Sequence, residues 1–304
     1  MLTQNDVPLL FRDGLIESYL DELPKWDPVY SQIAKQSSTD KPEQRAAIMT
    51  GLSRLAEIGD GEPVTFDKPR MSDVVQGLDR EWGGGFAVTL RTVEDDQYGK
   101  ANQGAKWLAN AVHQTLEYRV ASVLDDAFTG AVYRGIDNLP LISAAHTLIG
   151  SPNTVRNTPV NVVGFGITAY TQAMQLAQDM KDENGDPCRM WPTKLIMGND
   201  AVNYNRALQV MYSDNEPFTA NRQDNATRRR LKLPEPILNP YMLNTKHYFF
   251  VDDSKNDLNL VIRRKATYTT HNDFFTGAFL NKVTMRFLIW FVLWRGWLGF
   301  NPSV

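Results

Sequence analysis

The sequence is poor in the residues on which covalent cross-links, metal centres and membrane anchors depend. It has one cysteine, Cys188, which excludes a disulfide within the chain and fits a reducing compartment. Its four histidines have no paired spacing, and neither HExxH nor CxxC occurs, which argues against a zinc site. The longest apolar run, 287–294, has eight residues, whereas a membrane-spanning helix needs about 18 or more. The N-terminus also lacks the layout of a secretory signal, so we expect a soluble cytosolic product.

Charge and composition indicate a folded chain without a strong electrostatic preference. Apolar residues make up 42% and charged residues 22% of the 304 residues, which is far from the composition of a disordered chain. A net charge of −3 gives no global attraction to nucleic acid or to an anionic membrane. A chain of this length is expected to form about two domains.

The stretch from Thr92 to Gly130 predicts one long amphipathic helix, around which the rest of the chain is organised. Apolar residues recur in it at steps of three or four, which places them on one face. We expect this face to form a structural spine, made of Leu108, Val112, Leu116, Val120 and Val123. Thr92 followed by Asp95 has the form of a capping box, and Gly130 is a candidate left-handed stop.

The residues before this helix predict elements that gain little from packing on their own chain. Prolines break 1–45 into short pieces with one amphipathic turn, and a helix could begin at Asp40. A weak helical periodicity follows over 46–58. WGGGF (82–86) predicts a tight turn and 87–93 a strand, so we expect a two-stranded hairpin that projects from the body.

The remainder predicts a small α/β unit and two closing strands. The unit combines helices over 163–181 and 199–211 with strands over 192–198, 237–242 and 247–253 and a turn at 182–187. Strands over 258–271 and 282–300 end the chain. The continuous apolar core of the second predicts burial on both faces, with the long helix as its partner.

The motifs that hint at catalysis or ligand binding lack the context that such chemistry needs. SAAH (143–146) has no G-x-S-x-G elbow, so we interpret His146 as a loop histidine satisfied by backbone groups. The turn at 182–187 begins like a calcium loop, but Pro187 replaces its glycine and Thr193 its bidentate glutamate. GGG (83–85) precedes no helix that could present amides to a phosphate.

The charged clusters receive structural interpretations as well. Three aspartate pairs could bind metal or exchange protons: Asp95-Asp96, Asp125-Asp126 and Asp252-Asp253. Adjacent carboxylates on a helix point to different sides, and the first pair lies at a helix start where acidic residues are expected structurally, so we expect catalysis from none of them. The densest basic run, 228–230, is either a solvated loop or a partner for an acidic neighbouring chain, because the aromatic residues typical of single-strand binding are missing. We therefore expect no enzyme activity, no catalytic residue, no metal and no cofactor.

EDDQYG (94–99), LISAAHTLIG (141–150) and the aromatic terminal strand resemble the Mu-like major head subunit family of tailed phages. That family has the Hong Kong 97-type capsid fold, and the order of elements agrees over most of the chain. Thr147 stands where the family often has proline. The resemblance implies an α+β fold with five parts: an N-terminal arm (1–45), an extended loop or E-loop (46–93), a peripheral domain with the spine helix (94–150), an α/β axial domain (151–258), and return strands of the peripheral domain (259–304).

The same resemblance implies the function. We expect a major capsid protein of the virion, assembled in the cytoplasm of the bacterial host, whose copies form pentamers and hexamers of an icosahedral shell. The shell would enclose double-stranded DNA without sequence-specific binding. The implied partners are a separate scaffolding protein and a portal, and a decoration protein is left open. The start at Met1 leaves little room for a fused scaffolding extension, which favours a separate one.

We expect contacts between subunits from the arm and from Pro63–Thr92, and contacts around the capsomer axis from 220–242. The residues nominated for these contacts are Arg70, Met71, Asp73, Trp82, Phe86, Arg228, Arg229 and Arg230. Two alternatives remain open at this point. An encapsulin-like nanocompartment shell would use the same fold around a protein cargo, and an α/β hydrolase or binding protein would need a polar pocket in 141–200.

Overall fold

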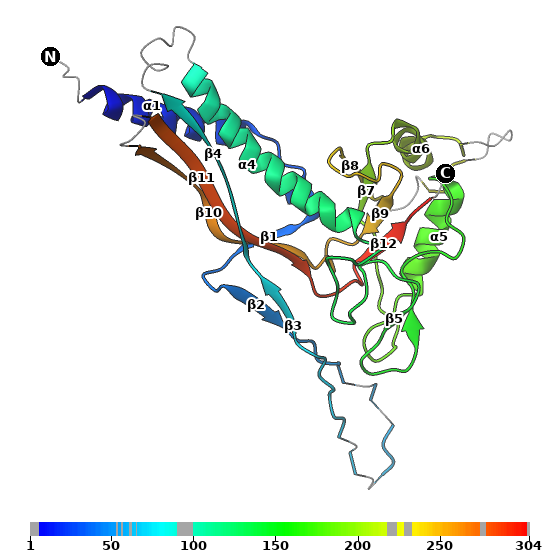
Figure 1. The fold of residues 1–304 in the computed structure, drawn as a ribbon. Coiled ribbons are helices and arrows are strands. Elements are labelled where there is room, and N and C mark those ends of the chain that lie inside the picture. Colours follow the sequence, from blue (N-terminus) through cyan, green and yellow to red (C-terminus); the bar gives the residue numbers. More distant parts are fainter. Residues whose placement is uncertain are drawn as a thin grey trace. The chain divides into compact units, whose positions relative to one another are not determined.

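The computed structural model describes residues 6–52, 54–55, 57–60, 63–64, 66–89, 100–217, 224–227, 233–273 and 278–302. The chain divides into two compact units, each assembled from separated stretches of sequence (Figure 1). The first comprises Met1–Glu43, Gly77–Val120 and Asn259–Ile289. The second comprises Gln44–Gln76, Ala121–Leu258 and Trp290–Val304. Because the chain crosses between the units several times, neither unit is one continuous piece of sequence.

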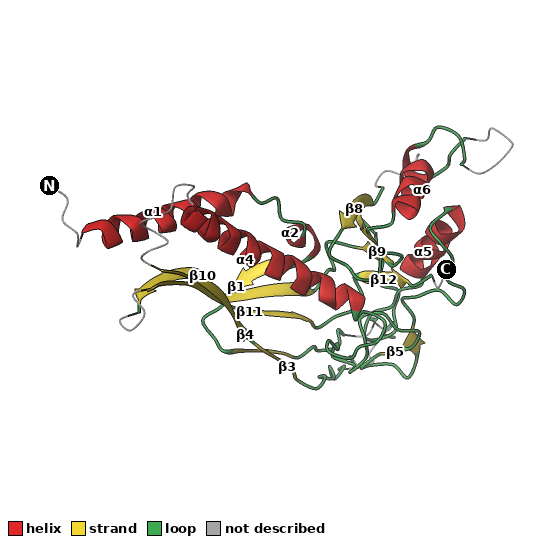
Figure 2. Cartoon of the chain, turned by 45° about the horizontal axis from the view of Figure 1, so that its top comes forward, coloured by secondary structure: helices red, strands yellow, loops and turns green. Residues whose placement is uncertain are grey.

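A four-stranded sheet with the order β1-β10-β11-β4 underlies the first unit. Its strands are β1 (Lys35–Ser38), β10 (Leu258–Asn272), β11 (Ala278–Phe291) and β4 (Arg80–Thr89). β1 runs parallel to β10, and β4 runs antiparallel to β11. The helices α1 (Asp6–Glu22) and α4 (Lys100–Asp125) lie over one face of this sheet (Figure 2).

The helix α4 carries the predicted spine, and its apolar face is confirmed. All five predicted spine residues are at most 8% exposed: Leu108, Val112, Leu116, Val120 and Val123. The α-helix begins at Lys100 and ends at Asp125, while Thr92 and Asp95 lie outside the described residues. Gly130 has a φ of 60°, the left-handed conformation predicted for it, although the α-helix has ended before it.

The prediction that WGGGF (82–86) forms a turn is wrong, because these residues lie inside β4. Gly83–Gly85 pair with Lys282–Thr284 of β11. A Cβ atom on Gly85 would lie 2.4 Å from the backbone oxygen of Asn281, which is closer than a real Cβ can approach. Glycine at this position therefore allows the two backbones to approach closely, which is a common reason for a glycine inside a strand.

The N-terminal arm packs on its own chain, contrary to the prediction. A full helix, α1, replaces the single amphipathic turn, and its residues Leu15 and Tyr19 are buried. The ring centroids of Tyr19 and Tyr268 of β10 lie 5.1 Å apart. After η1 (Leu23–Lys25), α2 (Tyr30–Ile33) buries both of its terminal residues. The arm's apolar side chains find partners far along the chain, which a local pattern does not reveal.

The helix expected from Asp40 and over 46–58 is also wrong for the described residues. The chain bends near residue 40, and β2 (Glu43–Ala46) then pairs with β3 (Val75–Leu78). Met49 and Met71 continue this ribbon as an isolated bridge. Pairing with a distant segment overrides the weak helical periodicity, as happens commonly for marginal propensities.

The second unit is built on a sheet with the order β12-β9-β7-β8. Its strands are β7 (Lys194–Gly198), β8 (Glu235–Asn239), β9 (Tyr248–Val251) and β12 (Trp297–Phe300). The unit also contains α5 (Ile167–Gln178), α6 (Ala201–Tyr212) and a small ribbon of β5 (His146–Thr147) and β6 (Thr154–Val155). The helices and strands predicted between residues 163 and 253 are thus confirmed, with shifts of a few residues at their ends.

The terminal segment 282–300 is two strands rather than one. β11 belongs to the first sheet and β12 to the second. Burial alternates along β11, so the prediction of burial on both faces is wrong there, whereas all four residues of β12 are buried. The Asp257 carboxylate accepts hydrogen bonds from the amides of Val292 and Leu293 at 3.1 and 2.9 Å. These bonds satisfy the backbone where the chain leaves one sheet for the other.

Two neighbouring glycines of β4 give a matched test of the close strand approach. Gly85→Ala should lower the free energy of unfolding by about 1–3 kcal/mol, because its Cβ meets backbone that has no room to move. Gly84→Ala should be neutral or slightly stabilising, since its Cβ would meet only Leu108 Cδ1 at 3.9 Å. Urea denaturation of both variants measures the difference, and equal stabilities would contradict the packing described for β4.

Candidate assembly interface

The ribbon of β2 and β3 continues into a long loop whose apolar side chains have no core to enter. Beyond β2 and β3, the Thr50 amide donates to the Arg70 oxygen across the ribbon at 2.8 Å. The Arg70 amide donates in turn to Thr50 Oγ1 at 2.8 Å. A two-stranded ribbon of this kind is only marginally stable when nothing packs on it. We call residues 43–78 the extended loop.

Exposed apolar surface concentrates on this extended loop. Among the described residues, nine of the eighteen exposed large apolar side chains belong to it: Met49, Leu52, Leu55, Ile58, Val64, Phe66, Met71, Val74 and Leu78. Leu55 is 100% and Phe66 92% exposed, so these two make no use of their own chain for burial. Exposed apolar surface of this density marks a site of protein association in a soluble protein.

The contact residues nominated from the sequence fall into three groups. Arg70, Met71 and Asp73 are exposed on the returning side of the extended loop. Trp82 and Phe86 lie apart from them in β4 and pack on α4: Arg119 lies 3.9 Å from the Trp82 ring centroid, and a Cβ on Gly104 would meet the Phe86 ring at 2.9 Å. Arg228, Arg229 and Arg230 lie outside the described residues.

Leu55 and Phe66 were not nominated from the sequence. The available signal was a series of single apolar residues interrupted by charged ones, such as Arg54 before Leu55 and Asp67 after Phe66.

The arm is held to α4 by one buried carboxylate. Glu117 is 1% exposed and accepts hydrogen bonds from the amides of Val29 and Tyr30 at 2.8 and 2.9 Å. Trp26 Nε1 donates to the same carboxylate at 3.4 Å. One turn earlier, His113 Nε2 lies 3.0 Å from the Leu23 oxygen. Burial is the main cause that raises the pKa of Glu117 and lowers the pKa of His113. The hydrogen bonds of both side chains therefore hold the arm against α4.

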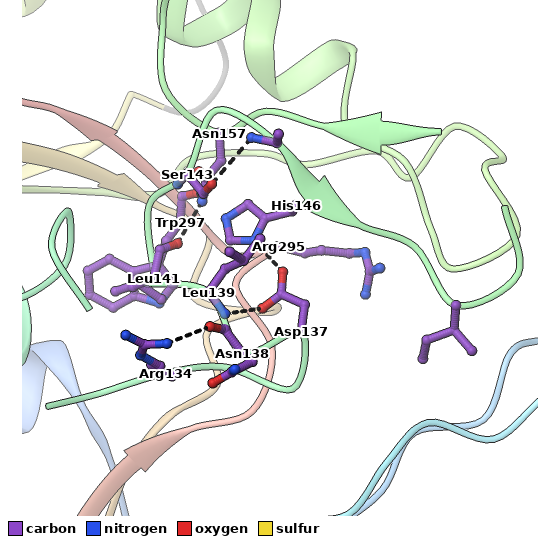
Figure 3. A network of polar contacts seen from close by, with 12 residues as sticks. Arg134, Asp137, Asn138, Leu139, Leu141, Ser143, His146, Asn157, Arg295 and Trp297 are labelled. Carbon is purple, nitrogen blue, oxygen red and sulfur yellow. Dashed lines mark hydrogen bonds and ion pairs between the residues drawn. The ribbon is translucent and has the colours of Figure 1, made fainter. Parts of the chain in front are cut away.

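The SAAH segment belongs to a buried polar network in the second unit (Figure 3). His146 is 0% exposed, its Nδ1 lies 2.6 Å from Asp137 Oδ2, and its ring stacks on Trp294 at 3.9 Å. The prediction that backbone groups satisfy this histidine is therefore wrong, because a carboxylate does so. No hydrogen bond joins Ser143 to His146 in the described chain, and His146 Nε2 has no hydrogen-bond partner. This geometry does not support a nucleophilic serine.

Asn157 holds the same network together. Its Nδ2 donates to the oxygens of Leu141 and Trp297 at 2.8 and 3.1 Å, and its Oδ1 accepts from the Ser143 amide at 2.8 Å (Figure 3). The Asn157 oxygen also accepts from the Gly299 amide. One buried amide side chain thus ties a loop to β12, and the network serves packing rather than chemistry.

Most carboxylates of the described aspartate pairs accept hydrogen bonds from backbone amides, and Asp253 forms an ion pair with Lys194. Asp125 accepts hydrogen bonds from the amides of Leu243 and Asn244, and Asp252 from the amides of Trp191 and Ser254. Asp126 accepts from Thr129 Oγ1 and from the amides of Ala131, Val132 and Tyr133. Burial alone would raise the pKa of Asp126, but these hydrogen bonds together hold it below its usual value. Asp95-Asp96 lies outside the described residues.

Other features of an enzyme or a carrier are weak in the described parts of the chain. There, no group of three or more histidine, cysteine or acidic residues is arranged to hold a metal ion. A shallow cavity of about 270 Å³ between α5 and the segment 187–192 is lined mostly by apolar side chains such as Met174 and Trp191. A hydrolase would need a polar pocket there. Within the same described residues, no helix has the length and apolarity to cross a membrane.

A family model described as phage capsid protein matches residues 80–298, which is more than half of the chain. The chain belongs to the phage capsid protein family. It is a major capsid protein, a structural virion component that associates with copies of itself into a shell. No curated protein matches the sequence.

Solved structures of phage particles share the fold at low sequence identity. A chain of Microbacterium phage Oxtober96 is 11% identical with a TM-score of 0.55, covering 91% of this chain and 92% of that chain. A procapsid chain of bacteriophage JBD30 is 12% identical with a TM-score of 0.54, covering 100% and 77%. A chain of a virus-like particle from Pyrococcus furiosus is 11% identical with a TM-score of 0.51, covering 94% and 96%. The predicted α+β fold of the Hong Kong 97 type is thereby confirmed.

Removing the carboxylate that holds the arm should loosen the arm and lower stability. Glu117→Ala leaves the buried Tyr30 amide and the half-buried Val29 amide without an acceptor, so the free energy of unfolding should fall by about 1–3 kcal/mol. Limited proteolysis should then cut within 22–34 faster than in the parent. Gln114→Ala, an exposed position on the same helix, is the control and should change neither result. Unchanged proteolysis in Glu117→Ala would refute the anchoring role.

The carboxylate of Asp126 should make part of the stability depend on pH. Because folding lowers the pKa of Asp126, the stabilisation is complete above the ordinary value of about 3.9 and is lost as the pH falls through the lowered value. Asp126→Asn should therefore cost most above pH ~5 and progressively less toward acid. Urea unfolding at several pH values measures this, with the exposed Glu57→Gln as control. A penalty that does not vary with pH would contradict the assignment.

Proposed function

We propose that this capsid protein is the major head subunit of a Mu-like tailed phage. Its copies form hexamers and pentamers that close an icosahedral shell around double-stranded DNA. Assembly takes place in the cytoplasm of the bacterial host, with a separate scaffolding protein and a portal as further partners. A net charge of −3 suits a container for DNA, because a strongly basic inner wall would bind the DNA electrostatically.

The extended loop is the observation that supports this proposal. Its ribbon exposes nine large apolar side chains and has no sheet beneath it. A second copy that covers this surface would bury it without requiring any change in the rest of the fold. The loop of one copy differs from the surface that receives it, so the contact is heterologous, and heterologous contacts close into rings when the rotation permits.

The proposed roles of the parts of the chain follow the expected domains, with one change in the bounds of the E-loop. We assign the E-loop to residues 43–78 rather than 46–93, because β4 is part of a four-stranded sheet. The arm, 94–150, 151–258 and 259–304 keep their expected roles as N-terminal arm, peripheral domain with spine, axial domain and return strands. We further propose that 220–242, which includes Arg228, Arg229 and Arg230, contacts neighbours around the capsomer axis.

An apolar-to-polar double substitution tests the proposal. Leu55→Ser with Phe66→Ser removes the two most exposed apolar side chains of the extended loop, so the fold of the free subunit should keep its stability within about 0.5 kcal/mol. Assembly should nevertheless fail, because the surface that another copy covers has lost its apolar anchors. Electron microscopy and light scattering of the purified protein measure particle formation.

The matched control is Val160→Ser, an apolar residue that is 75% exposed outside the extended loop. It should assemble like the parent. Normal particles from the double variant would rule out the extended loop as the contact surface. The contents of the parent's particles separate the two shell functions: packaged nucleic acid identifies a phage head, whereas a protein cargo would identify the nanocompartment instead.

A further inference from the structure

The turn at 182–187 touches the extended loop just beyond the end of its ribbon. Asn184 Nδ2 donates to the Gly51 oxygen at 2.9 Å and lies 3.4 Å from the Leu52 oxygen. Asp186 forms an ion pair with Arg54. These contacts follow directly after the pairing between Thr50 and Arg70 along the chain. They therefore restrain the loop next to its own ribbon.

The turn itself has a well-defined geometry. Asp182 Oδ1 accepts hydrogen bonds from the amides of Asn184 and Asp186 at 3.0 and 2.9 Å. The Asp182 amide donates to the Asp186 oxygen at 2.8 Å, and Gly185 has a φ of 89°. A side chain would be strained at that φ, so the glycine is what permits the tight reversal. Asn184 and Asp186 are consequently presented from a rigid base.

A buried ion pair fixes this base to the body of the second unit. Glu183 and Arg295 are each 7% exposed, and Arg295 Nη2 lies 2.6 Å from Glu183 Oε1. Glu183 also accepts the Ile149 amide at 3.0 Å, while Arg295 Nε donates to the Lys181 oxygen at 2.9 Å. A buried pair with these additional hydrogen bonds holds its geometry, because either partner alone would be an uncompensated charge.

The two contacts that reach the extended loop are different in kind. The Arg54 side chain is 75% and the Asp186 side chain 33% exposed, so water screens their ion pair and the pair is weak. The Asn184 hydrogen bonds go to backbone oxygens of the loop. Together, these bonds and the Arg54–Asp186 ion pair favour one orientation of the loop, but they are few and exposed enough to be released.

We propose that the 182–187 turn is a latch that orients the extended loop of the free subunit before another copy covers it. The proposal rests on the assembly role of the extended loop. Ordering a flexible segment costs roughly 1–2 kcal/mol per residue, and this cost opposes association when it falls at the moment of binding. A latch that orders Gly51 to Arg54 beforehand lowers that cost. Because the latch is reversible, the loop can still adjust to the angle that its neighbour requires.

Charge reversal on the free subunit tests the latch without any need for assembly. Arg54→Asp should loosen the loop, so hydrogen exchange at the amides of Thr50 and Ser72, which donate to backbone oxygens across the ribbon, should become about threefold faster or more. The reversal on the other side, Asp186→Arg, should do the same. Combining the two restores an ion pair of opposite orientation and should return exchange toward the parent rate.

The control reverses a charge on the same loop away from the turn. Glu57→Arg should leave the exchange of Thr50 and Ser72 unchanged. Asn184→Ala, which removes the other arm of the latch, should accelerate exchange as Arg54→Asp does. Parental exchange rates in Arg54→Asp, or a double reversal that exchanges as fast as either single variant, would overturn the latch.

Assembly kinetics distinguish this inference from the function on which it rests. Latch variants should form particles of normal shape more slowly, by about threefold, because their contact surface is intact but less ordered. Loss of the apolar anchors Leu55 and Phe66 should abolish particles without changing exchange at Thr50. If latch variants assemble at the parental rate although their loops exchange faster, the latch has no role in assembly, and the proposed contact surface still stands.

Discussion

The first unit depends on the burial of one apolar helix face over one sheet. The face of α4 runs from Leu108 to Val120 within this unit, and each of its large side chains loses nearly all contact with water. Fully burying a valine or leucine contributes about 1.5–3 kcal/mol, so this contact outweighs any single polar interaction nearby. It also explains the composition of β4: Gly84 and Phe86 meet the helix, while glycines on either side let the strand approach β11. The arm then adds to the same helix through Glu117.

The sequence was sufficient wherever local pattern and final environment agree. The spacing of Leu108, Val112 and Leu116 predicted a helix face that is buried, and the Asn-Gly pair at 184–185 predicted a turn that forms. It failed where an element is decided by a distant partner. Residues 43–46 become a strand because of 75–78, and the glycines at 83–85 sit in a strand because β11 lies beside them. Neither partner can be read from the segment itself.

The same contrast between local pattern and distant partner applies to the candidate interface. Of the residues nominated for contacts between subunits, Met71 is exposed on the extended loop, whereas Trp82 and Phe86 are half-buried in β4. Their aromatic character fits a contact surface and a packed position equally well; both are half-buried, and Arg119 of α4 lies over the Trp82 ring. The burial of His146 against Asp137 was equally beyond a local reading, since it depends on Trp294 from the end of the chain.

In the proposed assembly, the extended loop also has to avoid binding a wrong surface before another copy covers it. Its exposed apolar residues are never consecutive for long: Arg54 precedes Leu55, Glu57 precedes Ile58, and Asp67 follows Phe66. Charges placed in this way break up the continuous apolar segments that drive aggregation. A surface can bury this loop favourably only if it also leaves those charges in water or pairs them. The charges between the apolar residues therefore restrict which surfaces can bury the loop. They also help a free subunit to remain in solution at the concentrations from which the proposed shell would grow.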